Sequence, residues 1–496
     1  MGTQRPRRGL GRRRLGAAQI VFFVVAAAGP LFAIAGGVPT NFAVTGSVGV
    51  PLSFLLLAPI LALFAVGYAA MSRYIINAGA FYPYVANGVG KSSGAGIAFV
   101  TLITYNAIQI SVYGLFGWSV STWLGTLTGS PPPWWLCALM MVVIVGALGV
   151  LRVDLNAKVL GVALCLEVAV LTVVDVTLFA NPAGGSVSWV PLEPASLFTT
   201  GVGAVFAFSA AAFIGFEGAA TYGEETREPS RTVGRATFAA IGLTAVLYVV
   251  SSLALAVGAG PDVIVTTASA QGPDLLFNLA GGHLGETFSD VAYTLFVTGQ
   301  CAALLSFHNA VARYFFALGR EGLLPRSLAK TSKRTGAPVA GSLTQTALAL
   351  VVVAAFALAE RDPVTELFTW LGATASTGAV VIMIAVSLSV IGFFKRRRQA
   401  ENAWRRWIAP GLAMLALSAV LALILLNFDL LLGPAGSFLL RWGLPGLVVL
   451  AALVGFLRAE VLRTRDPETY AGIGGPLEEG EDARGPAALR SGHHPK

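Results

Sequence analysis

The chain has 496 residues, of which 55% are hydrophobic and 12% are charged. Soluble domains carry roughly 25% charged residues, so this composition excludes an ordinary soluble protein. The net charge of +8 would suit a nucleic-acid-binding protein, but the basic residues lie between long apolar runs. That placement is typical of a membrane protein and argues against a nucleic-acid-binding surface.

Twelve apolar runs follow one another along the chain. A helix that crosses a bilayer needs ~20 mostly apolar residues. Each span must be a helix, because hydrocarbon offers no partner for backbone polar groups, and the runs lack the alternation typical of a membrane β-barrel. The predicted spans are 17–45, 51–72, 94–124, 134–151, 157–179, 198–221, 233–258, 289–318, 341–359, 364–394, 408–428 and 441–458.

The basic residues give this arrangement an orientation. Of the 33 Lys and Arg residues, all except Arg361 and Arg441 fall on one side of the predicted membrane. The positive-inside rule places that side in the cytoplasm, so we expect a multi-pass protein of the cytoplasmic membrane with both termini cytoplasmic. One missed or additional span would exchange the sides of all later loops and destroy this asymmetry. We expect the lipid bilayer, and no nucleic acid, as the macromolecular partner.

The chain divides into five predicted regions. These are a basic cytoplasmic N-terminus (1–16), spans 1–5 (17–197), spans 6–10 (198–394), spans 11–12 with a basic loop (395–465), and a disordered cytoplasmic tail (466–496). The basic run Arg12–Arg14 before an apolar stretch resembles a signal peptide. Cleavage there would delete half of the first span, so we interpret it as an uncleaved first helix.

The sequence contains no complete motif of a soluble enzyme or a metal-binding protein. Gly90-Lys91-Ser92 resembles the end of a phosphate-binding loop, but that motif needs glycine at position 85, where Val85 stands. The three cysteines, Cys137, Cys165 and Cys301, lie inside apolar runs as packing residues. We therefore predict no enzyme activity, no cofactor and no metal.

Two predicted spans contain breaks at corresponding positions of the two sets of five. The first is punctuated by Gly29-Pro30 and by Gly36, and the sixth around Ile214-Gly215. A break inside hydrocarbon frees backbone groups and is tolerated only if it is buried in protein or lines a cavity. Paired broken helices form the midplane substrate site of many secondary transporters; the alternative is two kinked structural helices.

Ionisable groups within spans are costly and mark functional sites. Glu217 adjoins the break of the sixth span and Glu167 lies in the middle of the fifth. Each is a candidate for coupling to a proton or cation; a neutral acid bonded to a neighbouring helix is the alternative. Asp175, nearer the outer end of the fifth span, is expected at the interface.

Other polar side chains interrupt apolar spans. Tyr105 and Gln109 lie one turn apart in the third span, with Asn106 beside them. They either line a substrate path or join helices by hydrogen bonds. Gln300 in the eighth span is a further candidate for the path. Trp370 in the tenth span is a candidate gate, with packing as the alternative.

Several stretches resemble the amino acid–polyamine–organocation (APC) superfamily of permeases. The most specific is Phe213–Glu217 followed by Glu224–Pro229, which resembles the broken sixth helix and the acidic loop of that family. Asn77–Tyr84 resembles the segment after its second helix, and Arg313–Pro325 the end of its eighth. The resemblance extends over most of spans 1–10.

The resemblance implies an all-α, LeuT-like fold: a five-plus-five inverted repeat with broken helices 1 and 6 and two additional C-terminal helices. It also implies that both breaks hold an amino acid backbone. The family's first-helix signature is Gly-small-Gly-Ile-Phe, whereas this chain has Gly29-Pro30-Leu31-Phe32. Pro30 has no N–H to donate, which weighs against carboxylate binding there and favours substrates without a carboxylate.

The predicted site combines these residues. The gate candidates are Phe213, Phe216 and Trp370, and the coupling candidates are Glu167 and Glu217. The substrate-binding candidates are Ala28, Gly29, Pro30, Leu31, Gly36, Tyr105, Asn106, Gln109, Ala212, Phe213, Ile214, Gly215, Phe216, Glu217 and Gln300.

We expect secondary active uptake of an amino acid or related amine by alternating access, with a proton or cation as a further partner. Export or exchange of a polyamine or amine is the first alternative, because topology is the same for both directions. A membrane sensor that does not transport is the second, and a channel the third, although no ring of charges indicates a selectivity filter.

Overall fold

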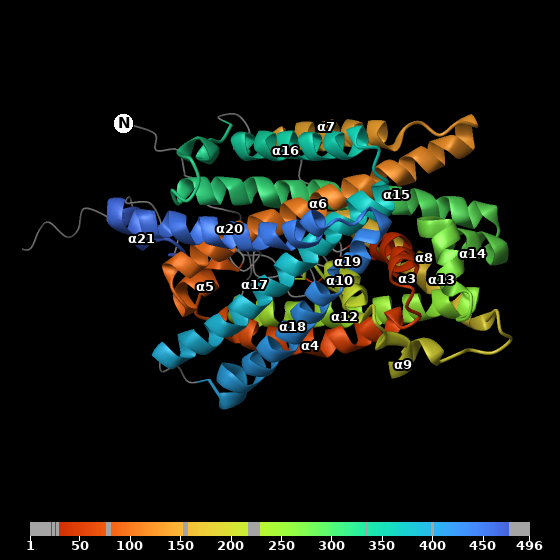
Figure 1. Ribbon diagram of the computed structural model, residues 1–496, viewed down its shortest axis with the longest axis horizontal. Helices are drawn as coiled ribbons and strands as arrows, with labels where there is room; N and C mark the ends of the chain where they lie inside the picture. The colour runs from red at the N-terminus through yellow and green to blue at the C-terminus, as the bar shows by residue number, and fades with distance from the viewer. Residues whose placement is uncertain are drawn as a thin grey trace, which may run out of the picture.

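The structure is a computed structural model that describes residues 21, 25, 29–75, 81–151, 157–216, 229–332, 336–397 and 401–475. Throughout these residues the regular elements are helical (Figure 1). Long helices run roughly along the long axis of the molecule, and short ones lie both at its ends and between the long helices.

The helices follow the predicted runs closely. Their bounds are α2 (Pro30–Phe32), α3 (Val38–Thr45), α4 (Val50–Met71), α5 (Tyr82–Gly88), α6 (Lys91–Thr128), α7 (Trp134–Val150), α8 (Ala157–Ala180), α9 (Pro194–Leu197), α10 (Val202–Ala212), α12 (Pro229–Ala259), α13 (Ile264–Gln271), α14 (Leu275–Leu284), α15 (Glu286–Arg320), α16 (Val339–Leu358), α17 (Thr369–Arg396), α18 (Ala409–Leu426), α19 (Phe428–Leu432), α20 (Phe438–Arg465) and α21 (Pro467–Gly472). π-Helical turns extend three of them: η1 (Ala33–Gly37), η6 (Pro363–Phe368) and η7 (Trp404–Ile408).

Nine of the helices in the described residues are long and apolar enough to cross a membrane. The prediction of an all-helical membrane protein is confirmed. Each of these nine overlaps one of the predicted spans, and most extend a few residues beyond it. The other three predicted spans, the first, fourth and sixth, contain the shorter apolar helices α2–α3, α7 and α10. The sixth is short because α10 ends at Ala212, nine residues before the predicted boundary, at a turn that begins with Phe213.

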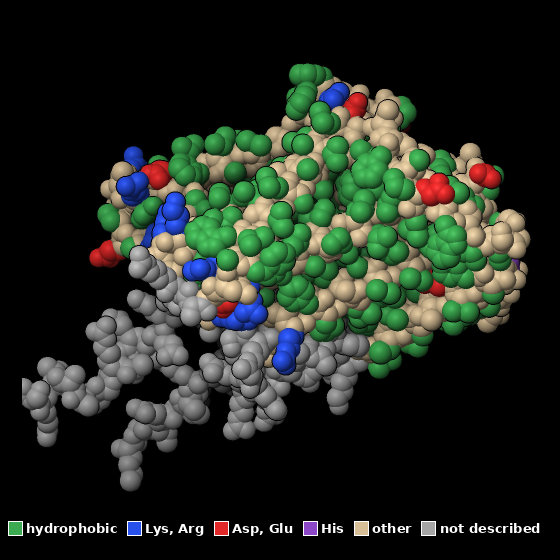
Figure 2. All heavy atoms as spheres, turned by 90° about the horizontal axis from the view of Figure 1, so that it is seen from below, with side chains coloured by type: hydrophobic (Ala, Val, Ile, Leu, Met, Phe, Trp, Pro, Cys, Tyr) green, Lys and Arg blue, Asp and Glu red, His purple; other side chains and the backbone are tan. Residues whose placement is uncertain are grey.

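The exterior is apolar over wide areas, as a protein surrounded by lipid requires. Figure 2 shows hydrophobic side chains spread over the face in view, with most Lys and Arg side chains toward one end. On α7, Leu136, Met140 and Val143 follow helical spacing and are each half exposed. Apolar residues thus cover both the inside and the outside of the bundle, so these helices carry no amphipathic pattern.

The helix α6 lies at the centre of the packing and contacts α7, α15, α17 and α20. Its contact with α20 is especially close. A Cβ at Gly455 of α20 would lie 2.4 Å from the carbonyl oxygen of Ala95 of α6, so only glycine fits there. The last spanning helix is therefore fastened to the centre of the bundle.

One end of the molecule, called the basic end below, is where α6 begins and where α4, α15, α17 and α20 end. It carries Lys91, Arg73, Arg320, Arg396 and Arg465 at these helix ends. The short helices α9, α13 and α14 lie at the opposite end (Figure 1). This segregation of positive charge agrees with the asymmetry predicted for the loops.

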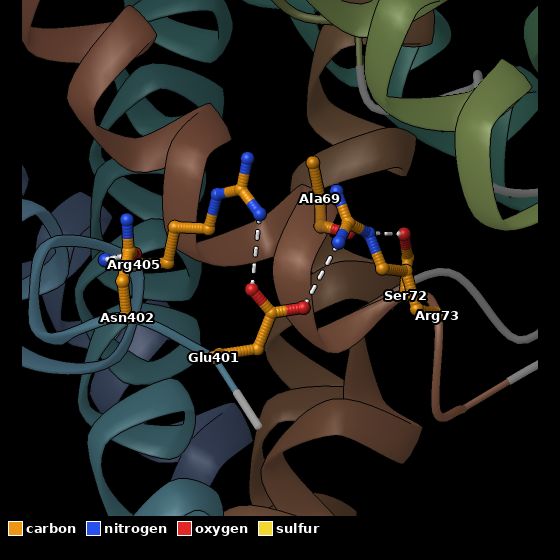
Figure 3. A network of polar contacts seen from close by, with 6 residues as sticks. All are labelled: Ala69, Ser72, Arg73, Glu401, Asn402 and Arg405. Carbon is orange, nitrogen blue, oxygen red and sulfur yellow. Dashed lines mark hydrogen bonds and ion pairs between the residues drawn. The ribbon is translucent and has the colours of Figure 1, made fainter. Parts of the chain in front are cut away.

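A buried carboxylate fastens two elements at the basic end (Figure 3). Glu401 lies between Arg73, which follows α4, and Arg405, in η7, at N–O distances of 2.9 and 3.1 Å. The Glu401 side chain is 5% exposed, whereas both arginines are partly exposed. The ion pairs join the end of α4 to the start of the α18 segment.

The start of the predicted disordered tail is helical. Asp466 accepts hydrogen bonds from the backbone and the hydroxyl of Thr469, which lowers the pKa of its carboxyl and begins α21. Tyr470 of α21 packs against Lys91 and its hydroxyl lies 3.2 Å from that of Ser92. Contacts with the start of α6 thus order residues whose composition alone indicates disorder.

Candidate functional site between two interrupted helices

The first break lies at Gly29. This residue has a left-handed backbone with φ of 53°, and α2 begins directly after it at Pro30. A Cβ at position 29 would lie 2.3 Å from Cδ1 of Phe32, so both the conformation and the space require glycine. The π-helix η1 follows, a feature frequent at functional sites. Ala28, a predicted site residue, lies outside the described residues.

The second break follows Ala212. There α10 ends, and Phe213–Phe216 form a turn in which Gly215 has φ of 120°. The carbonyl oxygen of Ala212 accepts a hydrogen bond of 3.1 Å from the hydroxyl of Tyr248, on α12. The predicted break of the sixth span is therefore present. Glu217, its predicted acid, lies outside the described residues.

A cavity of about 40 Å³, called the large cavity below, lies beside both breaks. Thr369 is the single described lining residue whose side chain carries a heteroatom. The described lining residues are Phe32, Ala33, Gly37, Ile108, Ala207, Phe208, Ala211, Ala212, Ile214, Phe307, Phe368, Thr369, Gly372, Ala373 and Leu431. The surface that α2, η1 and α10 present to this space is thus apolar, and Ala212, the last residue before the second break, is part of it.

A second cavity of about 20 Å³, called the small cavity, lies on the other side of Ile214. Ile214 lines both cavities. The large cavity includes Leu431 of α19, which lies toward the end opposite the basic end, whereas the small cavity includes Phe81, directly before α5 at the basic end. The turn after α10 therefore separates two spaces that lie toward opposite ends of the molecule.

Glu167, on α8, contacts the first break. Its Oε2 accepts a hydrogen bond of 3.3 Å from the backbone N–H of Leu31, in the first turn of α2. A carboxylate is stabilised at a helix N-terminus because the helix dipole is positive there. A Cβ at Gly299 of α15 would lie 2.6 Å from Oε1 of Glu167. The Glu167 carboxylate thus lies between α2, α8 and α15, buried from solvent.

Asp175, expected at the interface near the outer end of the fifth span, is buried within the protein. It is 6% exposed and its Oδ2 accepts a hydrogen bond of 2.7 Å from Ser251, on α12. It lies two turns after Glu167 on α8, and both acids approach the same neighbouring helix, α12.

Three predicted polar residues bond to protein. The side chain of Gln109 accepts from Gln345, on α16, at 2.5 Å, and that of Gln300 donates to Ser119, on α6, at 3.1 Å. Asn106 donates to the Leu102 carbonyl one turn earlier on its own helix. None of the three is among the described lining residues of either cavity, whereas Tyr105 lines the small cavity. Helix-to-helix bonding, the alternative left open above for the third span, fits Gln109, and Gln300 likewise bonds a neighbouring helix.

The gate candidates separate into two places. Phe213 packs against Phe54 and Tyr248 with ring centroids 6.1 and 5.4 Å away, and it lines the small cavity with Phe216. Trp370 instead packs against Phe356 and lies under the guanidinium of Arg361. Of the three, only the two phenylalanines border a described cavity.

Sequence reasoning missed several lining residues. Ile108, on α6, and Phe307, on α15, are apolar residues among many others on these helices, so their residue types alone do not distinguish them from packing residues. Tyr248, which bonds the second break, carried a recognisable signal, because Thr244, Tyr248 and Ser251 follow helical spacing in a mostly apolar span.

Comparison with known proteins identifies the family of this chain. The model of the amino acid permease family matches residues 15–454. The branched-chain amino acid permease BcaP of Lactococcus lactis subsp. cremoris is 26% identical over 395 residues, covering 75% of this chain and 79% of that protein. BcaP of Bacillus subtilis is 24% identical, covering 82% and 86%.

A plant relative is similar over a shorter stretch. The vacuolar cationic amino acid transporter 4 of Arabidopsis thaliana is 27% identical over 254 residues, which is 50% of this chain and 40% of that protein. The family match extends from the first predicted span to the last helix of the bundle. This chain therefore belongs to the amino acid permease family of the APC superfamily, and it is a membrane transporter and not an enzyme.

Proposed function

We propose that this permease takes up amino acids with aliphatic side chains, of the branched-chain type, by alternating access across the cytoplasmic membrane. The observation that carries the proposal is the apolar lining of the large cavity beside the two breaks. Phe32, Ile108 and Ile214 offer an aliphatic side chain dispersion contacts and release of water. The two bacterial relatives named as branched-chain permeases support the same class.

The backbone of the substrate belongs at the two breaks. Its carboxylate lies toward the positive N-terminal end of α2, and its ammonium group toward the carbonyl of Ala212 at the end of α10. Pro30 removes one amide from this end, and the amide of Leu31 bonds Glu167. Recognition of the carboxylate therefore relies on fewer amides than the family signature provides.

Alternating access uses the two cavities. The turn after α10, with Ile214 between the large and small cavities, is the barrier that separates them. The basic end faces the cytoplasm by the positive-inside rule. The large cavity then receives substrate from outside, and opening at Phe213 and Phe216 releases it through the small cavity. Twelve spans in a five-plus-five inverted repeat supply the scaffold.

Counterflow in reconstituted vesicles tests the substrate class. Vesicles loaded with leucine should accumulate radiolabelled leucine, and external isoleucine and valine should compete. Lysine and putrescine should not compete, because a buried ammonium group would find no carboxylate among the described lining residues. Competition by lysine or putrescine without competition by valine would reject this substrate class.

We also propose that uptake is coupled to protons through Glu167. Its carboxylate is buried, and it bonds the end of a broken helix whose position must change during transport. An acid inside the bilayer is costly unless it serves a function. An inward proton gradient should drive leucine accumulation in wild-type vesicles, while Glu167→Gln should retain counterflow and lose the response to the gradient. Equal accumulation with and without the gradient in the wild type would reject coupling.

A further inference from the structure

Part of the wall of the large cavity comes from a short helix near the end of the chain. Leu431, which lines the cavity, lies on α19, in the connection between the eleventh and twelfth predicted spans. The other described lining residues lie between Phe32 and Ala373, within the first ten predicted spans. A side chain from outside both sets of five spans therefore takes part in shaping this space.

The helix α19 packs against the helices that enclose the cavity. It contacts α3, α10 and α17. Both α10 and α17 supply lining residues, and α3 begins directly after Gly37, which also lines the cavity. Leu431 is 1% exposed to solvent. Its side chain is thus shielded by the same helices that surround the substrate space, and it is placed to contact whatever fills that space.

Two hydrogen bonds fix α19 to the start of α10. The side chain of Asn427, directly before α19, accepts a bond of 2.9 Å from the backbone N–H of Gly203 and donates one of 2.7 Å to the carbonyl oxygen of Thr200. A Cβ at Gly203 would lie 1.8 Å from the carbonyl oxygen of Leu423, on α18, so only glycine allows this approach. Because α10 ends at the second break, α19 and the broken helix form one packed unit on this side of the cavity.

The next residue, Leu432, has a different environment in the same helix. It is 2% exposed, so it is about as buried as Leu431, but it is not among the described lining residues of either cavity. An added Cβ at Gly436 would lie 3.0 Å from the Cβ of Leu432, which places Leu432 against the turn that follows α19. Successive residues of a helix point about 100° apart, and here one leucine faces the cavity while the other packs within protein.

We infer that Leu431 is a specificity-determining residue that limits the size of the substrate side chain in the large cavity. This inference rests on the proposed uptake of aliphatic amino acids and adds a size limit to it. The side chain of leucine or isoleucine packs against Leu431, whereas the benzyl group of phenylalanine overlaps it. Overlap in a close-packed apolar site is unfavourable, and the bonds of Asn427 to α10 prevent α19 from moving aside.

The variant Leu431→Ala tests this role, because it removes an isopropyl group from the cavity wall. Counterflow of radiolabelled leucine in reconstituted vesicles is measured with unlabelled leucine or phenylalanine as the competitor. In the wild type, phenylalanine should compete much more weakly than leucine. In Leu431→Ala the ratio of the two inhibition constants, phenylalanine to leucine, should fall at least about tenfold, as expected when an apolar pocket changes by more than one methylene group.

The matched control is Leu432→Ala. It removes the same group from an equally buried position of the same helix, so it should lower the melting temperature about as much as Leu431→Ala does. Its ratio of inhibition constants should stay at the wild-type value, because Leu432 is not among the described residues that line either cavity. A ratio of two substrates in one variant does not depend on the amount of folded protein, so loss of packing alone leaves it unchanged.

The outcomes separate this inference from the proposed function. An unchanged ratio in Leu431→Ala, or an equal fall in Leu432→Ala, overturns the role of Leu431 and leaves the aliphatic substrate class intact. Wild-type competition by phenylalanine as strong as that by leucine does the same. A wild type in which neither leucine nor valine competes overturns both proposals.

A second substitution covers the case in which Leu431→Ala does not fold. Leu431→Phe enlarges the side chain at the same position, so the KM for leucine should rise severalfold while that for alanine stays near the wild-type value. Equal changes in the two KM values, or no change in either, would contradict the role of Leu431.

Discussion

Gly372, on α17, lines the large cavity, and a Cβ there would meet no other atom within 4 Å. Gly372→Ala therefore adds a methyl group to the substrate space without a clash. We expect the KM for leucine to rise severalfold while that for alanine changes little, measured by counterflow. Gly411→Ala, in α18, adds a methyl group to equally open space outside both cavities and should change neither. Equal effects of Gly372→Ala on both substrates would place the leucine side chain elsewhere.

Asp274, in the connection between α13 and α14, gives a pH dependence of stability. Burial raises the pKa of its carboxyl to about 6, above the value of about 3.9 in unfolded chains. The folded state thus binds the proton more tightly, and stability is lost as pH rises from about 4 through 6. Asp274→Asn should raise the melting temperature at pH 7.5 by a few degrees and flatten its dependence on pH.

The control for Asp274 is an exposed acid nearby. Asp290 lies at the surface of α15, so Asp290→Asn should leave the melting curve near that of wild type. If the melting temperature of Asp274→Asn changes with pH as much as that of the wild type, burial of the Asp274 carboxylate does not weaken the folded state.

At the scale of elements, Glu401 joins α4 to the α18 segment through Arg73 and Arg405. Glu401→Gln leaves two arginines close together without a counter-charge. Because the carboxylate is buried and the arginines are partly exposed, we expect a loss of about 1–2 kcal/mol in the free energy of unfolding, between the values for surface and buried pairs. Thermal or denaturant melting in detergent measures it.

A weaker ion pair provides the comparison for Glu401. Asp429 and Arg441 lie 3.5 Å apart near the opposite end, and the Asp429 side chain is 58% exposed. Asp429→Asn should change stability little. If Glu401→Gln and Asp429→Asn melt alike, the ion pairs at the basic end do not stabilise the fold.

The spanning helices could be predicted well from the sequence. The breaks in the first and sixth spans could be predicted as well. Long apolar runs fix helices in a bilayer, and Gly29-Pro30 and Gly215 mark places where helical backbone cannot continue. The cavity lining could not be predicted, because Ile108 and Phe307 differ from lipid-facing neighbours only in tertiary position. Gln109 and Gln300 showed that a polar side chain in a span indicates a partner, without telling whether that partner is substrate or another helix.

At the scale of the whole molecule, the basic end is expected in the cytoplasm. Ser186, after α8, and Ser327, after α15, are exposed at opposite ends. In a background without native cysteines, a membrane-impermeant maleimide should label Ser186→Cys in intact cells. It should label Ser327→Cys only after the membrane is opened. The reverse pattern would invert the transporter and turn the proposed uptake into export.

The central claim is that an aliphatic amino acid lies between the two broken helices with its side chain in the large cavity. An experimental structure of the purified protein with bound leucine tests it most directly. We predict density for the isobutyl group among Phe32, Ile108 and Ile214, with the ammonium group at the carbonyl of Ala212. Leucine bound with its side chain outside this cavity, or away from both breaks, would contradict the account.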